Sequence, residues 1–246
     1  MAEGASLMSL EFIEIFGIPA SGKTMLVNRL ANEHGIMSRD AGLRKALNLE
    51  RMGVVRWLLY KSGMSGGSFD EITVGLLDQG VLTDKRLFQC VFDYLVQANV
   101  AERNAEVALS SLLRTSREYA LLKDEFPEGK ILMDEGWVHR TMAVFGMRSE
   151  SEAPVQWLKR YVDSLRAPKT VIYMKGDADT CLARITAREP KPRCWWNEWT
   201  SDEQKRALLQ SLECFEIIIN ALELRGCRIF RSDGTVTGKM LDVLKR

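Results

Sequence analysis

The sequence is poor in the residues that metal sites and disulfide frameworks require. It has two histidines, His34 and His139, and five cysteines that are widely spaced and form no C-x-x-C pair. Because structural zinc sites need clustered cysteine and histidine ligands, a zinc protein is not expected. An odd number of separated cysteines predicts reduced thiols and a cytoplasmic protein.

Long apolar runs and an excess of charge are absent as well. No stretch approaches the roughly 18–20 apolar residues of a membrane span. The N-terminus has no basic region followed by an apolar run, so a signal peptide is not expected. The formal net charge of +1 gives no overall attraction to nucleic acid or to a membrane surface, and neither is expected as a partner.

The apolar content is sufficient for a large core, because 46% of the 246 residues are apolar. This length is normal for one α/β domain with an insertion. Short apolar runs at 10–16, 35–38, 130–134, 170–174 and 227–231 are typical of buried strands, and helical patterns separate them. Strands that alternate with helices predict a parallel sheet covered on both faces.

One motif dominates the N-terminal region. Gly17, Gly22, Lys23 and Thr24 match G-x-x-x-x-G-K-[ST] without a mismatch, between an apolar run and a helical pattern. The glycines let the main chain close around an anion, and backbone N–H groups at the start of the helix point at phosphates. Lys23 would bridge the β- and γ-phosphates, and the Thr24 hydroxyl would bind Mg²⁺. The predicted nucleotide-binding residues are Gly17, Ile18, Pro19, Ala20, Ser21, Gly22, Lys23, Thr24 and Met25.

Asp134 and Glu135 follow the strand predicted at 130–134. A carboxylate at the carboxyl end of a buried strand can hold Mg²⁺ or accept a proton from an attacking hydroxyl. We take both as catalytic candidates and Asp134, with Thr24, as a metal candidate. The sequence leaves open which acid has which role, and two surface acids at a strand end are the alternative.

Positive charges gather at residues 184–193, across a helix end and a loop broken by two prolines. Arg184 and Arg188 are four apart and share a helix face. Together with Arg193 they are candidates for stabilising the charge of a transferring phosphoryl group, in a lid at about 184–200. The alternative is a solvated basic face that pairs with Glu189 and Asp179.

Residues 40–125 show helical patterns throughout and predict a helical insertion between two core segments, 9–38 and 129–246. The insertion would cover the substrate side of the sheet or form a homodimer surface. Arg140, after the Asp134-Glu135-Gly136 turn, would contact a substrate or be an ordinary surface arginine.

Four stretches, taken in order, resemble the nucleoside and nucleotide kinase group of P-loop proteins, above all its thymidylate-kinase-like members. They are the phosphate loop at 17–24, the acid-containing turn and helix at 134–140, the strand, helix and arginines at 171–188, and the tail at 231–234. The resemblance implies a three-layer α/β/α fold with a five-stranded parallel sheet. It also implies MgATP as the phosphoryl donor and a lid that closes on binding.

The resemblance assigns charge stabilisation to Lys23 and Arg188, with Arg184 and Arg193 as helpers. It places the tail that contains Asp233 near the adenine. The acceptor motif diverges, because Arg39 and Asp40 stand where the family has its acidic or arginine-bearing motif. They are our substrate-binding candidates, together with Arg140.

The sequence therefore predicts an ATP- and Mg²⁺-dependent kinase acting on a hydroxyl or phosphate of a small acceptor, either nucleoside- or nucleotide-like or sugar-like. The alternative is a regulatory P-loop ATPase whose helical insertion binds a protein partner. No basic stripe beyond residues 184–193 supports a nucleic-acid substrate.

Overall fold

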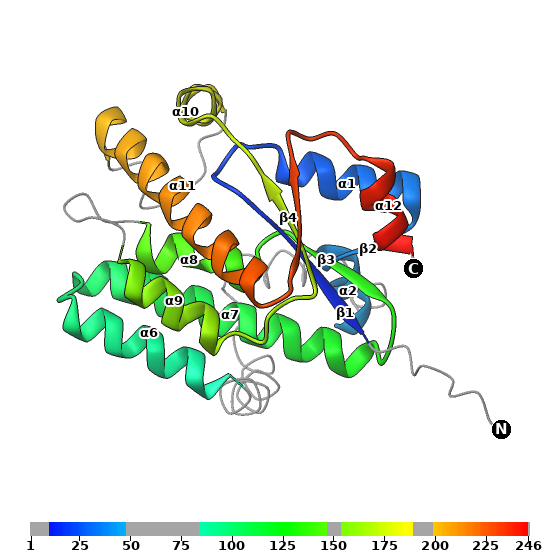
Figure 1. Ribbon diagram of the computed structural model, residues 1–246, viewed down its shortest axis with the longest axis horizontal. Coiled ribbons are helices and arrows are strands. Elements are labelled where there is room, and N and C mark those ends of the chain that lie inside the picture. Colours follow the sequence, from blue (N-terminus) through cyan, green and yellow to red (C-terminus); the bar gives the residue numbers. More distant parts are fainter. Residues whose placement is uncertain (1–9, 48–83, 147–153, 189–198, 246) are drawn as a thin grey trace.

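The computed structural model describes residues 10–47, 84–146, 154–188 and 199–245 (Figure 1). Five strands in these ranges form one all-parallel sheet in the order β2-β3-β1-β4-β5. The strands are β1 (Glu11–Phe16), β2 (Met37–Ser38), β3 (Lys130–Met133), β4 (Thr170–Met174) and β5 (Arg228–Ser232). The prediction of an α/β fold with a parallel sheet of about five strands is confirmed.

Nine helices in the described ranges flank the sheet. They are α1 (Lys23–His34), α2 (Arg39–Ala46), α6 (Lys85–Gln97), α7 (Glu102–Glu125), α8 (Trp137–Phe145), α9 (Val155–Ser164), α10 (Ala178–Thr186), α11 (Ser201–Leu224) and α12 (Gly238–Lys245). In Figure 1, α1 and α12 cover one face, and α7, α8, α9 and α11 cover the other. This is the three-layer arrangement predicted from the sequence.

β1 is the central strand, hydrogen-bonded to β3 on one side and β4 on the other. Its alternation sends Ile13 and Ile15 into the core beneath α1 and α12. Phe16 points to the opposite core, where it stacks on Tyr173 of β4. Glu14 shares that side and is also buried. The phosphate loop therefore starts from the rigid centre of the sheet.

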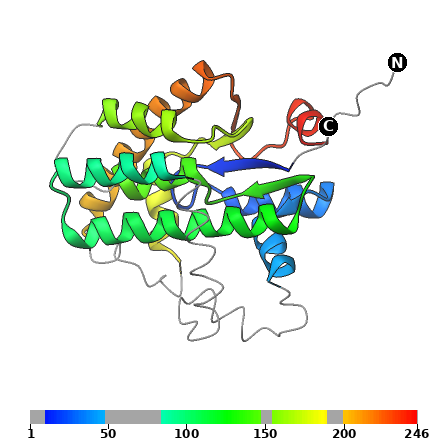
Figure 2. The same cartoon turned by 90° about the horizontal axis from the view of Figure 1, so that it is seen from below.

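The helical insertion is present in α2, α6 and α7, whereas residues 48–83 lie outside the described ranges. α7 is the long helix that runs beneath the sheet in Figure 2. α2 packs on its C-terminal half, because Leu43, Leu122 and Phe126 share one apolar cluster with β3. α2 and the C-terminal half of α7 thus lie against the edge of the sheet that carries β2 and β3, whereas α6 packs on α9.

Most predicted boundaries agree with the structure. α1 ends at Gly35, which has a left-handed φ of 67°. Two predictions were off by one position: Pro154 precedes α9 as its N-cap instead of lying in its first turn, and β5 begins at Arg228 instead of Cys227. The capping box of Thr200 and Glu203 that begins α11 was not predicted.

Cys90, Cys181, Cys214 and Cys227 are buried free thiols, as predicted, and Cys194 lies outside the described ranges. Among the helices that the structure describes, none combines the length and apolarity needed to cross a bilayer.

Candidate functional site

The loop between β1 and α1 has the geometry of an anion cradle. A Cβ at Gly17 would lie 2.6 Å from the carbonyl oxygen of Met174, so only glycine lets the loop pass this close to β4. Gly22 begins α1 with a left-handed φ of 98°. Within the described residues, no side chain caps α1 and no acid lies in its first turn. Its first N–H groups are therefore available to an anion.

Lys23 lies over this loop. Its ammonium group donates hydrogen bonds to the carbonyl oxygens of Gly17 (2.8 Å) and Ile18 (2.9 Å). Burial lowers the pKa of Lys23 to about 8, although Glu135 and Asp134 oppose this shift. The side chain therefore remains mostly charged at neutral pH.

Ser21 adds a free donor to the same loop. Its hydroxyl is buried and has no hydrogen-bond partner within the described structure. A buried hydroxyl without a partner is costly, so the loop is built to accept a further ligand atom. Thr24 lies on the exposed side of the first turn of α1.

Arg184 of α10 contacts the phosphate loop, and Arg188 lies just beyond the end of this helix. Arg184 donates a hydrogen bond from its guanidinium group to the carbonyl oxygen of Ala20 (3.2 Å). Arg188 is near enough for its charge to lower the pKa of Lys23. Asp179, the partner expected for a solvated basic face, pairs instead with Lys205 (2.6 Å). Residues 189–198, including Arg193, lie outside the described ranges.

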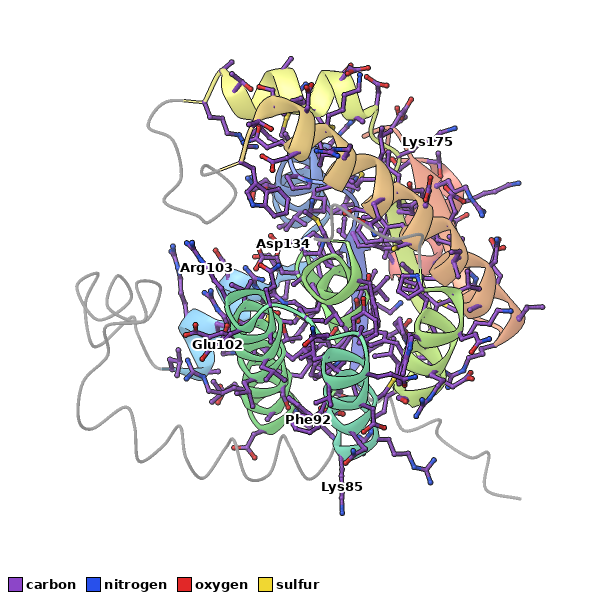
Figure 3. All side chains as sticks on the ribbon, turned by 90° about the vertical axis from the view of Figure 1, so that its left-hand side faces the viewer. Lys85, Phe92, Glu102, Arg103, Asp134 and Lys175 are labelled. Atoms are coloured by element: carbon purple, nitrogen blue, oxygen red, sulfur yellow. The ribbon has the colours of Figure 1, made fainter. Side chains whose placement is uncertain are left out.

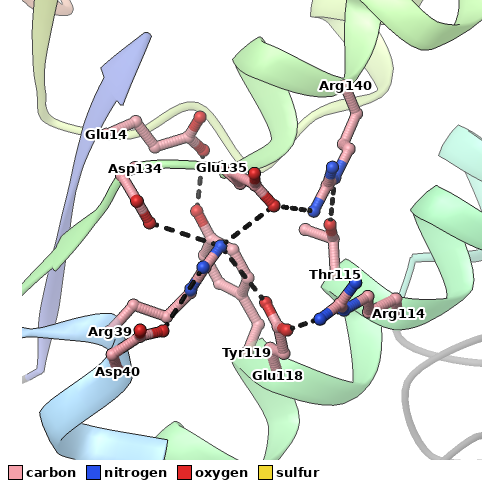
Figure 4. Close-up of polar contacts among 10 residues, drawn as sticks. All are labelled: Glu14, Arg39, Asp40, Arg114, Thr115, Glu118, Tyr119, Asp134, Glu135 and Arg140. Carbon is pink, nitrogen blue, oxygen red and sulfur yellow. Dashed lines mark hydrogen bonds and ion pairs between the residues drawn. The ribbon is translucent and has the colours of Figure 1, made fainter. Parts of the chain in front are cut away.

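A charge cluster surrounds Arg39 at the carboxyl ends of β2 and β3 (Figure 4). One guanidinium nitrogen of Arg39 lies 3.3 Å from Asp134, 3.3 Å from Glu135 and 3.8 Å from Glu118. The other terminal nitrogen lies 3.4 Å from Asp40. Arg39 is only 8% exposed. The predicted substrate-binding residues Arg39 and Asp40 thus lie beside the predicted acids Asp134 and Glu135. The positive charge of Arg39 is already neutralised by the carboxylates around it.

Arg140 joins this cluster from α8. It donates one hydrogen bond to the Thr115 hydroxyl (2.6 Å) and another to the Glu135 carboxylate (3.1 Å). Arg114 pairs with Glu118 on α7 (3.3 Å). The interpretation of Arg140 as an ordinary surface arginine is therefore wrong.

The surroundings shift the pKa values of the two predicted acids, Asp134 and Glu135, in opposite directions. Burial raises the pKa of Asp134, and Arg39 only partly offsets this effect. Burial acts on Glu135 in the same direction, but Arg140 and Arg39 outweigh it and hold that pKa well below its usual range. Glu135 is thus fixed as an anion, whereas Asp134 exchanges a proton more readily.

The site lies on the face of the molecule shown in Figure 3, where Asp134 is labelled near the centre of the view. Lys85 and Phe92 of α6 lie at the lower edge of the molecule in this view, well away from Asp134. A cavity of about 630 Å³ opens near the amino ends of β1 and β4, and Glu14, Tyr119 and Trp137 are among the residues that line it. No residue of the phosphate loop at 17–24 is among those that line this cavity.

The residues fit a nucleoside triphosphate, because glycines, a lysine, an unpartnered serine hydroxyl and open helix N–H groups converge on one loop. For Mg²⁺ the structure offers the Thr24 hydroxyl and the Asp134 carboxylate. Both are oxygen ligands of the kind Mg²⁺ prefers, and phosphate oxygens usually complete its shell. Within the described residues no cluster of three histidine, cysteine, aspartate or glutamate side chains forms a metal site.

Asp233, a predicted nucleotide-binding residue, makes a hydrogen bond within its own turn. It is exposed after β5, and its carboxylate accepts a hydrogen bond from the backbone N–H of Thr235 (3.0 Å).

His139 was not predicted as a site residue, but its environment is unusual. Its Nδ1 atom is buried and has no hydrogen-bond partner among the described residues, and burial followed by the charge of Lys23 lowers the pKa of His139 well below the usual range. The imidazole is therefore neutral, and the charges of both Lys23 and Glu135 act on it.

Glu14 was missed by the sequence analysis, although it contacts the turn that carries both acids. The signal was available, because an acidic residue interrupts the apolar run of the central strand. A charged side chain at such a position is rarely left buried unless it has partners.

The sequence matches no protein-family model, and it matches none of the curated proteins. The five-stranded parallel sheet with helices on both faces is consistent with a Rossmann-like or P-loop fold.

Proposed function

We propose that the protein is a MgATP-dependent phosphotransferase, a small-molecule kinase related to the P-loop nucleoside and nucleotide kinase group. The observation that carries this proposal is the hydrogen bond from Arg184 of α10 to Ala20 in the phosphate loop. It brings a cation from late in the chain to the loop that Lys23 already covers.

On the donor side, Lys23 and Arg184 bind and orient the phosphate chain, and Arg188 adds positive charge nearby. Phosphoryl transfer spreads negative charge over the phosphoryl oxygens, so preorganised cations stabilise the transition state. When bound, Mg²⁺ would be held by the Thr24 hydroxyl and phosphate oxygens, with Asp134 as a candidate further oxygen ligand, and would supply further charge neutralisation. Ser21 offers its unpartnered hydroxyl to a phosphate oxygen.

On the acceptor side, α2, α7 and the β3–α8 turn surround the charge cluster. The two arginines there, Arg39 and Arg140, are paired with carboxylates, so they have little positive charge left for a phosphate. This arrangement favours a hydroxyl acceptor over a phosphate acceptor. An Asp134 carboxylate that is not bound to Mg²⁺ would accept the proton from that hydroxyl, whereas one that binds Mg²⁺ would not.

The test is to incubate the protein with MgATP and a panel of nucleosides, nucleoside monophosphates, sugars and aminoglycosides. Mass spectrometry and ³¹P NMR then identify any phosphorylated product. A product that disappears in Lys23→Ala supports the kinase. Slow ATP hydrolysis that every acceptor leaves unchanged supports a regulatory ATPase instead, and failure to bind ATP refutes both.

A further inference from the structure

Glu14 forms a buried link between the phosphate-loop strand and the turn that carries the two acids. The side chain lies on β1, three positions before Gly17, and is 1% exposed. One carboxylate oxygen accepts a hydrogen bond from the Tyr119 hydroxyl of α7 (2.8 Å, Figure 4). The other accepts one from the backbone N–H of Val138 in the first turn of α8 (2.7 Å). Each carboxylate oxygen therefore accepts a hydrogen bond from a residue more than a hundred positions later in the sequence.

The turn itself is fitted to this carboxylate. Gly136 precedes α8 as its N-cap and offers no side-chain cap of its own. A Cβ on Gly136 would lie 2.4 Å from the carboxyl carbon of Glu14, so the backbone can lie this close only because the residue is glycine. A carboxylate at a helix N-terminus is stabilised by the N–H groups and the positive end of the helix dipole. Glu14 thus caps α8 from another element.

We propose that Glu14 is a positioning residue, whose carboxylate holds the Gly136–Val138 turn and thereby fixes Asp134 and Glu135 beside the phosphate loop. The proposal rests on the kinase function, since it gives those two acids their role. β1 ends in the loop that binds the donor, and α8 begins at the turn that faces the acceptor. A short, charge-assisted contact between them sets the distance between the two halves of the site.

The charge of Glu14 is finely balanced. Burial raises its pKa to about 7, while the Tyr119 hydroxyl and the backbone N–H groups of Val138 and Trp137 oppose that effect. Tyr119 keeps its proton, because burial and the neighbouring carboxylate raise its own pKa well above the usual value. The positive charge of Arg140 on α8 also lowers the pKa of Glu14. Glu14 in turn raises the pKa values of Tyr161 on α9 and of Cys227 before β5. Above neutral pH the anion accepts both hydrogen bonds at full strength, and protonation weakens this hold.

The experiment is hydrogen exchange followed by mass spectrometry on the full chain, in wild type, Glu14→Gln and the matched control Glu11→Gln. Glu11 lies on the same strand, and its carboxylate accepts a hydrogen bond from Thr170 at the far end of the sheet. At pH 8, the backbone amides of residues 134–140 should exchange about tenfold faster in Glu14→Gln than in wild type, as expected when a charge-assisted hydrogen bond is lost. The exchange rate in residues 17–26 should not change. Wild type should show the same acceleration at pH 6 after correction for intrinsic exchange. Glu11→Gln should show neither effect.

Turnover and nucleotide affinity give a second readout. Glu14→Gln should bind a fluorescent ATP analogue with near wild-type affinity while kcat falls by about tenfold or more. Tyr119→Phe removes one of the two bonds and should have a smaller effect on the same segment. Unchanged exchange at 134–140 refutes the role of Glu14 whatever the enzyme does with ATP. Faster exchange throughout the chain also refutes it, because that result means general destabilisation. A wild type that binds no ATP, but shows the expected exchange, overturns the kinase function and leaves the Glu14 link standing.

Discussion

Arg184 and Ala20 are joined by a hydrogen bond of 3.2 Å, although 164 residues separate them in the sequence. The contact brings α10, which follows β4, to the loop that follows β1. β1 and β4 are neighbours in the sheet, so the carboxyl ends of two adjacent strands supply the cations of the site. The sheet topology, rather than any local motif, brings these residues together.

Arg184→Ala tests this contact directly. Because the guanidinium group lies over the loop, its loss should lower kcat by about 10–100-fold and weaken nucleotide binding less. The measurement is steady-state kinetics beside titration with a fluorescent ATP analogue. Arg160→Ala is the matched control, since Arg160 pairs with Asp93 on the distant α6 and its loss should change neither value. Equal losses in both variants would contradict a role at the loop.

Lys23→Ala should have the largest effect of any single change on the donor side. It removes the ammonium group that lies within 3 Å of the loop carbonyls, and we expect a loss of turnover of about 100-fold or more. Arg29→Ala on the exposed face of α1 is the control, because among the described residues Arg29 pairs with Glu33 on the same helix and with no residue of the loop. Wild-type turnover in Lys23→Ala would show that the lysine has no catalytic role.

The sequence predicted the fold well because its signals are local. Apolar runs bounded by glycine or proline marked the strands, and α1 begins and ends at Gly22 and Gly35 as the motif and the stop signal require. The strand order is a different matter. It depends on which helix crosses which face, and no short stretch of sequence encodes that choice.

The candidate site was predicted only in part, for the same physical reason. The phosphate loop is a continuous motif, so its residues could be named from sequence alone. The charge cluster is not continuous: Arg39, Glu118 and Asp134 come from α2, α7 and the end of β3. Arg39 was predicted to contact substrate, and its neutralisation by carboxylates is visible only once these elements are packed together. Glu14 was missed because its partners are equally remote.

Arg39→Met should destabilise the fold strongly. The guanidinium group faces four carboxylates. Removing it would leave Asp134 without its main counter-charge and the buried Glu118 with Arg114 alone. Breaking a buried ion pair costs about 3–5 kcal/mol, whereas the exposed pair of Arg29 should contribute only about 0.5 kcal/mol. Urea unfolding at pH 7 measures both.

A second change separates charge from packing at Arg39. Arg39→Met combined with Glu118→Gln removes one buried negative charge, and it should recover part of the lost stability. A double variant no more stable than Arg39→Met would mean that the guanidinium group acts mainly by filling space.

The pH dependence of stability isolates Glu14. Its pKa is raised from 4.5 to about 7 in the folded protein, so between these values the folded state binds more protons than the unfolded state. The free energy of unfolding must therefore fall as pH rises through this window, by about 3 kcal/mol from Glu14 alone. Glu135 acts with the opposite sign and at lower pH, because its pKa is depressed and its stabilisation is lost only as pH falls below its unfolded value of 4.5.

Urea unfolding of wild type and Glu14→Gln at pH 5, 6, 7 and 8 gives the comparison. The glutamine does not titrate, so the difference between the two free energies of unfolding should change steadily with pH in favour of the variant. Groups common to both proteins cancel in that difference. A difference that stays constant from pH 5 to pH 8 would mean that Glu14 ionises normally. In that case the buried carboxylate would be charged throughout this range, and its hold on the Gly136–Val138 turn would not depend on pH.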